Sequence, residues 1–499
     1  MTPFNLAAIN FAWLPILPLI AVTIGAMVIL LAGVRMADDE SEGLGWLGLA
    51  TLGVAFVLAL GLIGQTGFAF GGALAVDGFS AFFQLTILIT AAFTILMSLD
   101  YASDNHLAGA EYYSLLLFST VGMMLMAGAG DLVVIFLGLE TMSIAVYVLA
   151  GMRRRDPRSN EAAIKYFLLG AFSTGFLLYG IALIYGATGS IKLDAIRTAL
   201  SGSMTSNSLL RLGLAMLLVG FGFKVAAVPF HMWTPDVYEG ATTPITAFMA
   251  VGVKLGAFAG FVRIFLVGLL PVSAQWSEAL WVVAVLTMTT GNVIAVVQTN
   301  IKRMLAYSAI AHAGYVLVGM IAASPEGGAA VLYYLLTYAF TTLGAFGIVV
   351  ALERRQLVGD LIADYRGLST RSPALAAAMA VFLLSFTGVP PLAGFMGKFY
   401  IFSAALRQGY TYLVVIAVIN SVIAAFYYIS VIVAMYMEEG GGVEPARMTR
   451  RPALVAAIGL SAIATVLVGI YPAPYMTAAQ NAFNSAMGEA AMRAASLGQ

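Results

Sequence analysis

The sequence predicts an all-α polytopic membrane protein with about fourteen transmembrane helices, forming a single transmembrane domain over residues 1–499. The chain is 61% hydrophobic and only 10% charged, whereas soluble domains are about 25% charged. It therefore lacks the charge needed to cover a water-facing surface. Many of its apolar stretches also exceed the ~18 residues that mark a helix able to span a bilayer.

Charge and cysteine content exclude several classes of site. The formal net charge is zero, which argues against a nucleic-acid partner. Because the chain has no cysteine, it holds no disulfide, no cysteine-ligated iron–sulfur cluster and no Cys-type zinc site. We expect neither a metal nor a cofactor in this chain. The first apolar segment lacks a basic n-region, so we predict a span rather than a cleavable signal.

Fourteen apolar segments follow one another along the chain. The fourth and fifth are separated only by Gly130 and Asp131, and the seventh could be drawn through a "PFHMWTP" break, so the count lies between thirteen and fifteen. The predicted spans are at about 12–33, 45–64, 78–99, 112–129, 131–151, 163–187, 209–228, 242–268, 277–299, 304–323, 328–352, 374–406, 411–437 and 452–471.

The basic residues of the loops alternate, which favours an even number of spans. Loops after even-numbered spans hold only Lys192, Arg197 and Arg407. By the positive-inside rule, the other loops face the cytoplasm, and both termini face the opposite side of the membrane. Loops after odd-numbered spans hold Arg35, Arg153, Arg154, Arg155, Arg158, Lys302, Arg303, Arg354, Arg355, Arg366, Arg371, Arg447, Arg450 and Arg451.

Proline and glycine interrupt two spans, the seventh at "VAAVPFHMWTPDVYEGATTP" and the twelfth at "FTGVPPLAGFMGKFY". Such breaks free backbone carbonyls and amides for polar side chains and water. The two breaks are five spans apart, and a repeat of five helices inverts its second copy because five is odd. Paired discontinuous helices point to an inverted-repeat transporter. We therefore predict two inverted five-helix repeats, 112–268 and 277–437, with discontinuous helices 7 and 12.

Lysine is placed differently from arginine in this chain. Of six lysines, Lys165, Lys224, Lys254 and Lys398 lie within predicted spans, whereas nearly all arginines lie in loops or at span ends. A lysine in a desolvated site can lose and regain a proton, but arginine stays protonated. An uncompensated charge at mid-membrane costs at least ~2.5–3.5 kcal/mol, so these lysines indicate proton transfer. Snorkelling to the headgroups is the alternative, and it stays open above all for Lys165, close to the start of its span.

Three further titratable residues lie in or beside spans. Glu140 is the only acid deep inside a predicted span, and a pair with Lys224 would hold that lysine protonated until the two separated. The alternative is a lone carboxyl kept neutral by burial. His231 follows Lys224 by two helical turns, and His312 lies eight or nine residues into the tenth span. Each histidine is either a neutral hydrogen-bonded group or a proton relay between lysines.

Three segments resemble a known family: "VAAVPFHMWTPDVYEGATTPITAFMAVGVK", "NIKRMLAYSAIAHAGYVLVG" and "FTGVPPLAGFMGKFY". They are similar to the antiporter-like membrane subunits of respiratory complex I, the proton-translocating NADH–quinone oxidoreductase. The resemblance covers nearly the whole chain and is most specific over 130–400. The form "GVPPLAGFMGKF", with lysine at 398, favours the subunit N branch of this family.

The resemblance implies a translocase subunit that moves protons through buried lysines while NADH oxidation and quinone reduction occur elsewhere in the complex. It implies no redox centre in this chain, with FMN, iron–sulfur clusters and quinone in other subunits. Its neighbours would be the antiporter-like subunit M, the small subunit K and lipids. The family's functional residues match Glu140, Lys165, Lys224, His231, Lys254 and Lys398.

Two other functions remain open at this stage. The first is a cation/proton antiporter subunit of the multisubunit sodium–proton type, which works without redox coupling. The second is a membrane spacer whose lysines pair only for packing.

Overall fold

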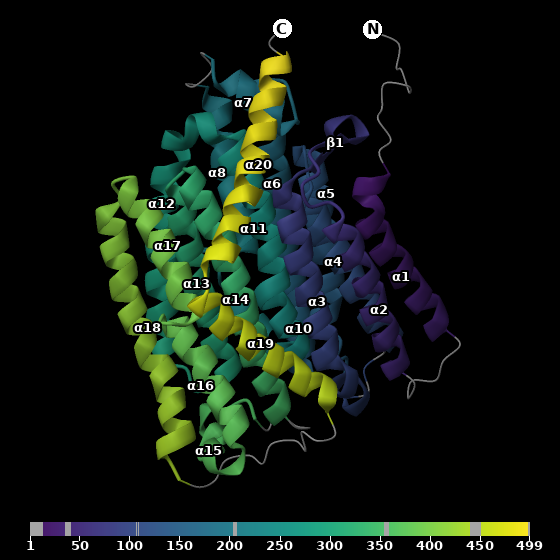
Figure 1. Ribbon diagram of the computed structural model, residues 1–499, viewed down its shortest axis with the longest axis vertical. Coiled ribbons are helices and arrows are strands. Elements are labelled where there is room, and N and C mark those ends of the chain that lie inside the picture. Colours follow the sequence, from purple (N-terminus) through teal and green to yellow (C-terminus); the bar gives the residue numbers. More distant parts are fainter. Residues whose placement is uncertain are drawn as a thin grey trace.

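The computed structural model describes residues 13–34, 41–105, 107, 109–202, 207–353, 359–439 and 451–497. Within these residues the chain is helical apart from one short hairpin, and its helices stand side by side in a bundle (Figure 1). Helix α1 lies at one side of this view and α18 at the other. Arg35, Arg354, Arg355, Arg447 and Arg450, used above to orient the loops, lie outside the described residues.

Twelve helical segments of the described chain are long and apolar enough to cross a membrane. One of them, Thr243–Gly268, joins α10 (Thr243–Phe248), the π-helical segment η6 (Met249–Val253), α11 (Lys254–Val262) and a second π-helical segment, η7 (Arg263–Gly268). The others are α1 (Leu17–Gly33), α2 (Ser41–Leu60), α3 (Gly78–Asp104), α4 (Gly109–Ala127), α5 (Leu132–Ala150), α6 (Pro157–Thr188), α12 (Ser273–Val296), α13 (Ile301–Ile321), α14 (Pro325–Leu352), α18 (Thr411–Met437) and α19 (Pro452–Ile470).

The two remaining predicted spans are the seventh and the twelfth. In each, the helix ends at the proline- and glycine-rich break and a second helix follows. Helix α8 (Ser208–Lys224) ends at the first break and the short α9 (Thr234–Gly240) follows it. Helix α16 (Pro373–Thr387) ends at the second break and α17 (Ala393–Arg407) follows it. All fourteen predicted spans thus correspond to helices, and the all-α membrane class is confirmed. The division into repeats 112–268 and 277–437 stays a prediction.

Several elements were not predicted from the sequence. They are the hairpin of β1 (Gly67–Ala69) and β2 (Leu74–Val76), the 3₁₀ turns η2 (Leu14–Ile16), η4 (Phe70–Gly72), η8 (Leu270–Val272) and η9 (Ile362–Tyr365), and the helices α7 (Leu193–Leu200), α15 (Leu368–Arg371) and α20 (Ala473–Leu497). Figure 1 shows β1, α7 and the end of α20 at one end of the bundle. Helix α20 is tied to α3 by a hydrogen bond that the Gly78 amide donates to Ser485 Oγ at 2.8 Å.

The opposite end carries the ion pairs of the odd-numbered loops, and we call it the basic face. It is formed by the C-terminal ends of α3, α5 and α14, the N-terminal ends of α13 and α19, and the segment 359–371. Arg153 after α5 pairs with Glu353 after α14 at 2.7 Å. Arg451 before α19 pairs with Asp104 of α3. The alternation of loop charge therefore corresponds to two distinct ends of the bundle.

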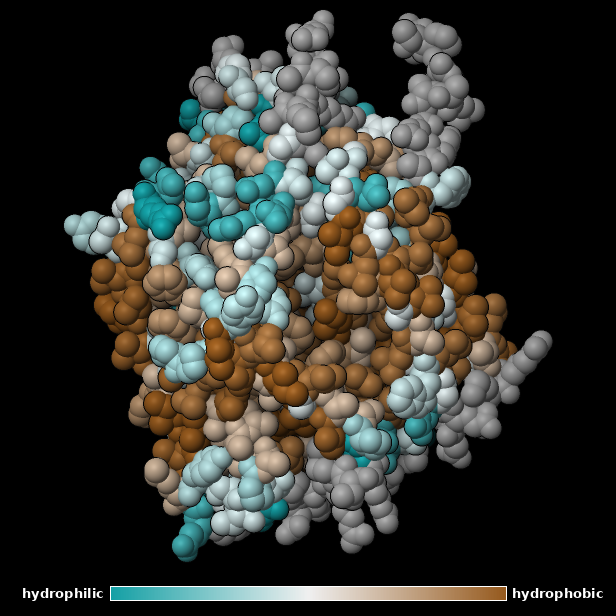
Figure 2. Space-filling model, in the orientation of Figure 1, coloured by the Kyte–Doolittle hydropathy of each residue, from teal (hydrophilic) through white to brown (hydrophobic). Residues whose placement is uncertain are grey.

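The centre of the bundle is formed by α10–η7, α13 and α14. In the most apolar stretch of each of these three helical segments, 100%, 94% and 89% of the residues are buried, compared with 28% for α1 and 33% for α18. Figure 2 shows the matching surface, with mostly hydrophobic residues around the middle and hydrophilic residues toward both ends. Side chains on the central helices are thus shielded from lipid by the outer helices.

Candidate functional site

Lys224 is the last residue of α8, at the first break, and its side chain is buried. Its Nζ donates to two hydroxyl oxygens of α5, Ser143 Oγ at 2.8 Å and Tyr147 Oη at 2.9 Å. The ammonium also lies 5.1 Å from the centre of the Tyr147 ring and 5.9 Å from that of Tyr166. Neutral oxygens and ring faces therefore surround this lysine.

Glu140 lies on α5 one turn before Ser143 and is half-buried. Its Oε1 accepts a hydrogen bond from Thr174 Oγ1 of α6 at 2.7 Å. It forms no ion pair with Lys224 in the described structure. Glu140 instead binds a hydroxyl of α6, while Lys224 binds hydroxyls of α5. Both the pair and its switching stay predictions.

Lys254 begins α11 directly after the π-helical segment η6. Short π-helical segments inside helices are frequent at functional sites. The side chain is 3% exposed, and Nζ donates to the backbone carbonyl of Ala309 on α13. It also lies 5.8 Å from the centre of the Tyr338 ring on α14.

His312 lies one turn after Ala309 on α13 and is 5% exposed. Its Nδ1 is 2.5 Å from Tyr334 Oη, and its Nε2 is 3.2 Å from Tyr428 Oη. The imidazole thus bridges hydroxyls on α14 and α18. A neutral bridging group and a proton relay both fit this geometry.

Lys398 explains the second break. Its Nζ donates to the carbonyls of Phe386 at 2.8 Å and Thr387 at 3.0 Å, and to Ser421 Oγ of α18 at 2.6 Å. Both carbonyls belong to the last turn of α16, which the break leaves without helical partners. Gly388, at φ 91°, makes the turn there and lies against the Lys398 side chain. The predicted use of freed carbonyls is confirmed.

Helix α13 connects the second and third of these lysines. Ala309 accepts from Lys254, His312 follows one turn later, and the ring centre of Tyr315, a further turn on, lies 5.0 Å from Lys398 Nζ. Three successive turns of one buried helix therefore face Lys254, the histidine and Lys398. We call this row of polar groups in an otherwise apolar core the lysine line.

The neutral partners in this line were not identified from the sequence. Serine and tyrosine are common in membrane helices, and nothing in their spacing distinguishes the ones that bind a lysine. They are Ser143, Tyr147, Tyr315, Tyr334, Ser421 and Tyr428.

Lys165 lies outside the line. Its side chain is 39% exposed and pairs with Asp236 at 2.5 Å and Glu161 at 2.6 Å. Asp236 also pairs with Arg303 at 2.9 Å. Lys165 thus belongs to a partly exposed ionic cluster that ties α6 to α9 and α13.

His231 lies within the first break and is half-buried. Its Nδ1 is buried and accepts or donates no hydrogen bond among the described residues. No hydrogen bond joins its ring to Lys224 in the described structure.

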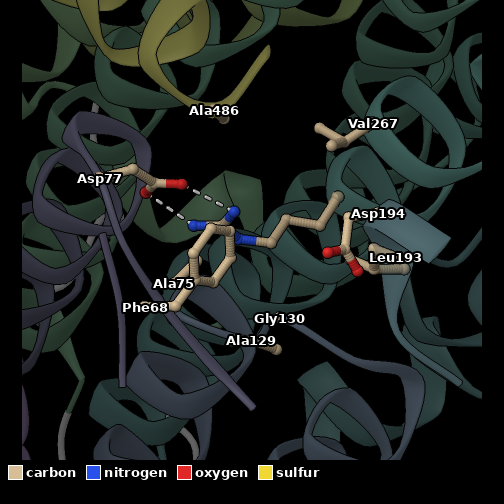
Figure 3. Close-up of a pocket in the computed structure, with 10 residues that line it drawn as sticks. Phe68, Ala75, Asp77, Ala129, Gly130, Leu193, Asp194, Val267 and Ala486 are labelled. Carbon is tan, nitrogen blue, oxygen red and sulfur yellow. Dashed lines mark hydrogen bonds and ion pairs between the residues drawn. The ribbon is translucent and has the colours of Figure 1, made fainter. Parts of the chain in front are cut away.

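A separate pocket lies at the end opposite the basic face, with a volume of about 20 Å³ (Figure 3). Asp77, labelled there, binds the Arg263 guanidinium at 2.7 and 2.9 Å, and the two side chains are 1% and 3% exposed. Arg263 Nε donates to the carbonyl of Ala127 at 2.7 Å. This pair joins α3, α4 and η7, and it does not touch the lysine line. No group of three or more His, Asp or Glu that could hold a metal occurs in the described residues.

Comparison with known proteins adds an independent observation. A family described as NADH:quinone oxidoreductase/Mrp antiporter matches residues 129–424. The chain is 46% identical over 471 residues to "NADH-quinone oxidoreductase subunit N" of Trichlorobacter lovleyi, covering 94% of this chain and 96% of that protein.

Two solved structures are similar in fold. A chain of respiratory complex I from Thermus thermophilus is 35% identical, with a TM-score of 0.79, covering 93% of this chain and 100% of that one. A chain of the Mrp complex from Dietzia is 21% identical, with a TM-score of 0.80, covering 95% and 98%. At that identity the second likeness concerns the fold alone.

Proposed function

The chain belongs to the NADH:quinone oxidoreductase/Mrp antiporter family, within its subunit N branch, and on that basis we propose that it moves protons through its buried lysines. It is a multi-pass membrane protein and a subunit of a NADH–quinone oxidoreductase complex. Oxidation of NADH and reduction of quinone take place in the complex, and this chain contributes proton translocation.

The line along α13 is the observation that carries the proposal. Lys224, Lys254 and Lys398 are all at least 95% buried, and none forms an ion pair with a described residue. Neutral oxygens, which suit both protonation states of an amine, are their partners. A lysine can exchange its proton in such a site, whereas an arginine cannot. A spacer whose lysines serve only packing would pair them with carboxylates, as Lys165 is paired.

The steps follow from the order of the groups. A proton from the basic face binds the Lys224 amine and passes to Lys254. It then moves through the His312 imidazole, between Tyr334 and Tyr428, to Lys398, and leaves toward the opposite end. Each transfer breaks one N–H bond and forms another, so no further reactant is needed.

Glu140 is the proposed switch. It now binds Thr174, and movement by about one turn of α5 would bring it to Lys224 and hold that ammonium charged. Its half-buried position on α5 allows a neighbouring subunit to act on it. Moving one charge against 100 mV costs about 2.3 kcal/mol, which is within the range of a single charge–charge contact in a partly buried site.

The finer assignments belong to the same proposal. The neighbours are subunit M and subunit K, with lipids around the rest, in a bacterial inner membrane with both termini on the periplasmic side. FMN, iron–sulfur clusters and quinone reside in other subunits, and this chain has no redox centre. Residues 112–268 and 277–437 act as the two inverted repeats, each with one broken helix.

The test uses the assembled complex in sealed vesicles. Lys224→Ala and Glu140→Ala should each reduce proton pumping and quinone reduction. Lys192→Ala, which changes a half-buried loop lysine bound to the Gly71 carbonyl, should leave both unchanged. Normal pumping in both Lys224→Ala and Glu140→Ala would reject the proposed proton path. An Mrp-type antiporter is the second candidate, because the matching family includes such antiporters. It predicts cation/proton exchange without NADH and no co-purifying NADH dehydrogenase activity.

A further inference from the structure

Asp360 is an unusual carboxylate at the basic face. It lies in the segment between α14 and η9, and its side chain is 4% exposed. Neither carboxylate oxygen accepts a hydrogen bond from any described residue. Among the described residues, Asp360 forms an ion pair only with the fully buried Lys302 of α13. The Lys302 Nζ is 3.9 Å from Oδ2, too far for a hydrogen bond.

Two other carboxylates of the same end accept hydrogen bonds. Glu353 accepts from Arg153 at 2.7 Å, from Tyr101 at 2.9 Å and from Thr243. Asp364 accepts from the amides of Gly359 and Leu361, each at 3.0 Å. The lack of partners is therefore specific to Asp360.

Four charged groups act on Asp360: Lys302, Glu353, Arg153 and Glu239. Burial raises the pKa of its carboxyl to about 6, Lys302 opposes the rise, Glu353 adds to it, and Arg153 and Glu239 act more weakly in opposite directions. A buried carboxylate without hydrogen bonds costs several kcal/mol when ionised. Protonation, or contact with internal water, removes that cost.

Other buried hydroxyls without partners continue from this point into the bundle. Tyr365 Oη, close enough to Asp360 to interact with its charge, has no hydrogen-bond partner among the described residues. Lys302 Nζ donates to the Ala241 carbonyl at 3.3 Å, at the end of α9. One turn back on α9, Tyr238 Oη is also buried without a partner.

Tyr238 leads from α9 to the second lysine. It lies near Tyr338, whose ring centre is 5.8 Å from Lys254 Nζ. Buried polar groups left without protein partners are the usual positions of internal water. Asp360, Tyr365 and Tyr238 are therefore the groups that internal water would join between the basic face and Lys254.

We propose that Asp360, beside Lys302, is a second proton-uptake site, which loads Lys254, His312 and Lys398 without passing through Lys224. A hydronium ion from the aqueous phase protonates the carboxylate, and the proton leaves through water past Tyr238 to the Lys254 amine. Lys302 then faces the regenerated carboxylate. The inference rests on the proposed function, because it supplies protons to the same lysine line.

The first test is an infrared difference titration of the intact purified complex between pH 5 and 8. The wild-type complex should show the carbonyl signal of a buried carboxylic acid disappearing near pH 6. Asp360→Asn should lack that signal. Asp104→Asn, which alters an exposed carboxylate on the same face, should retain it. An unchanged signal in Asp360→Asn would overturn the assignment, whatever the complex pumps.

The second test measures pumping in sealed vesicles. The number of protons pumped per NADH oxidised should fall in Asp360→Asn. It should be restored in Asp360→Glu and match the wild type in Asp104→Asn. A titrating Asp360 with full pumping in Asp360→Asn would overturn the uptake role. Normal pumping in variants of Lys224 and Lys398 would instead contradict the proposed function itself, so the two failures can be told apart.

Discussion

Glutamine at position 312 separates the two roles that the structure permits for the histidine. Its amide can still bond the hydroxyls of Tyr334 and Tyr428, but it cannot accept and pass on a proton. Each neutral hydrogen bond contributes about 1 kcal/mol, so loss of one or both leaves the fold intact. Ala309 and Tyr315 are six residues apart on α13, about 9 Å along the helix, while proton transfer needs about 2.6–3.2 Å between heavy atoms. Removing the relay therefore interrupts the line.

The assay is proton pumping per NADH oxidised, measured in sealed vesicles that contain the assembled His312→Gln complex. We expect pumping to be lost while the complex remains assembled. Tyr333→Phe is the control, because it removes a buried tyrosine hydroxyl of α14 that binds the Val468 carbonyl and none of the groups on the line. Wild-type pumping in His312→Gln would show that the imidazole is only a hydrogen-bonded packing group.

Three more outcomes follow from particular contacts. Asp77→Asn leaves Arg263 as a buried unpaired charge and should destabilise the protein by about 3–5 kcal/mol, measured as a lower melting temperature; an unchanged value would contradict this. Gly394→Ala should abolish pumping, since its Cβ would lie 1.9 Å from a carbonyl oxygen of α16 at the break, whereas Gly459→Ala, with open space, should be harmless. The pKa of Asp360 is about 6 in the folded protein and 3.8 for an ordinary aspartate, so the native state binds a proton more tightly than the unfolded chain. As the pH rises from 4 to 6, the unfolding free energy of the wild type should fall by up to roughly 3 kcal/mol relative to that of Asp360→Asn. A difference between the two that stays constant with pH would refute this prediction.

The helices and breaks were predictable because they depend on local chemistry. Apolar length decides a span, and proline with glycine decides a break, so α8 and α16 end where the sequence indicated. Lysines within apolar runs are rare enough to attract attention, and all three of the deeper ones proved buried. The hairpin at 67–76 and helix α20 were missed because neither has the apolar length of a span.

The partners of the lysines depend on tertiary contacts between distant segments. Ser421 reaches Lys398 from a different helix, and nothing local distinguishes it from other serines. The same holds for Asp360, which looks like an ordinary loop carboxylate in the sequence but is buried beside the start of α13. Lys165 shows the opposite case, where a lysine in an apolar run binds carboxylates near a helix end.

Replacing Lys398 with arginine tests the central claim most directly, because it keeps the positive charge at the second break and removes only the ability to release a proton. Proton pumping per NADH should be lost in Lys398→Arg as fully as in Lys398→Ala, with intact complex recovered in both. Normal pumping by the arginine variant would contradict proton exchange at this amine.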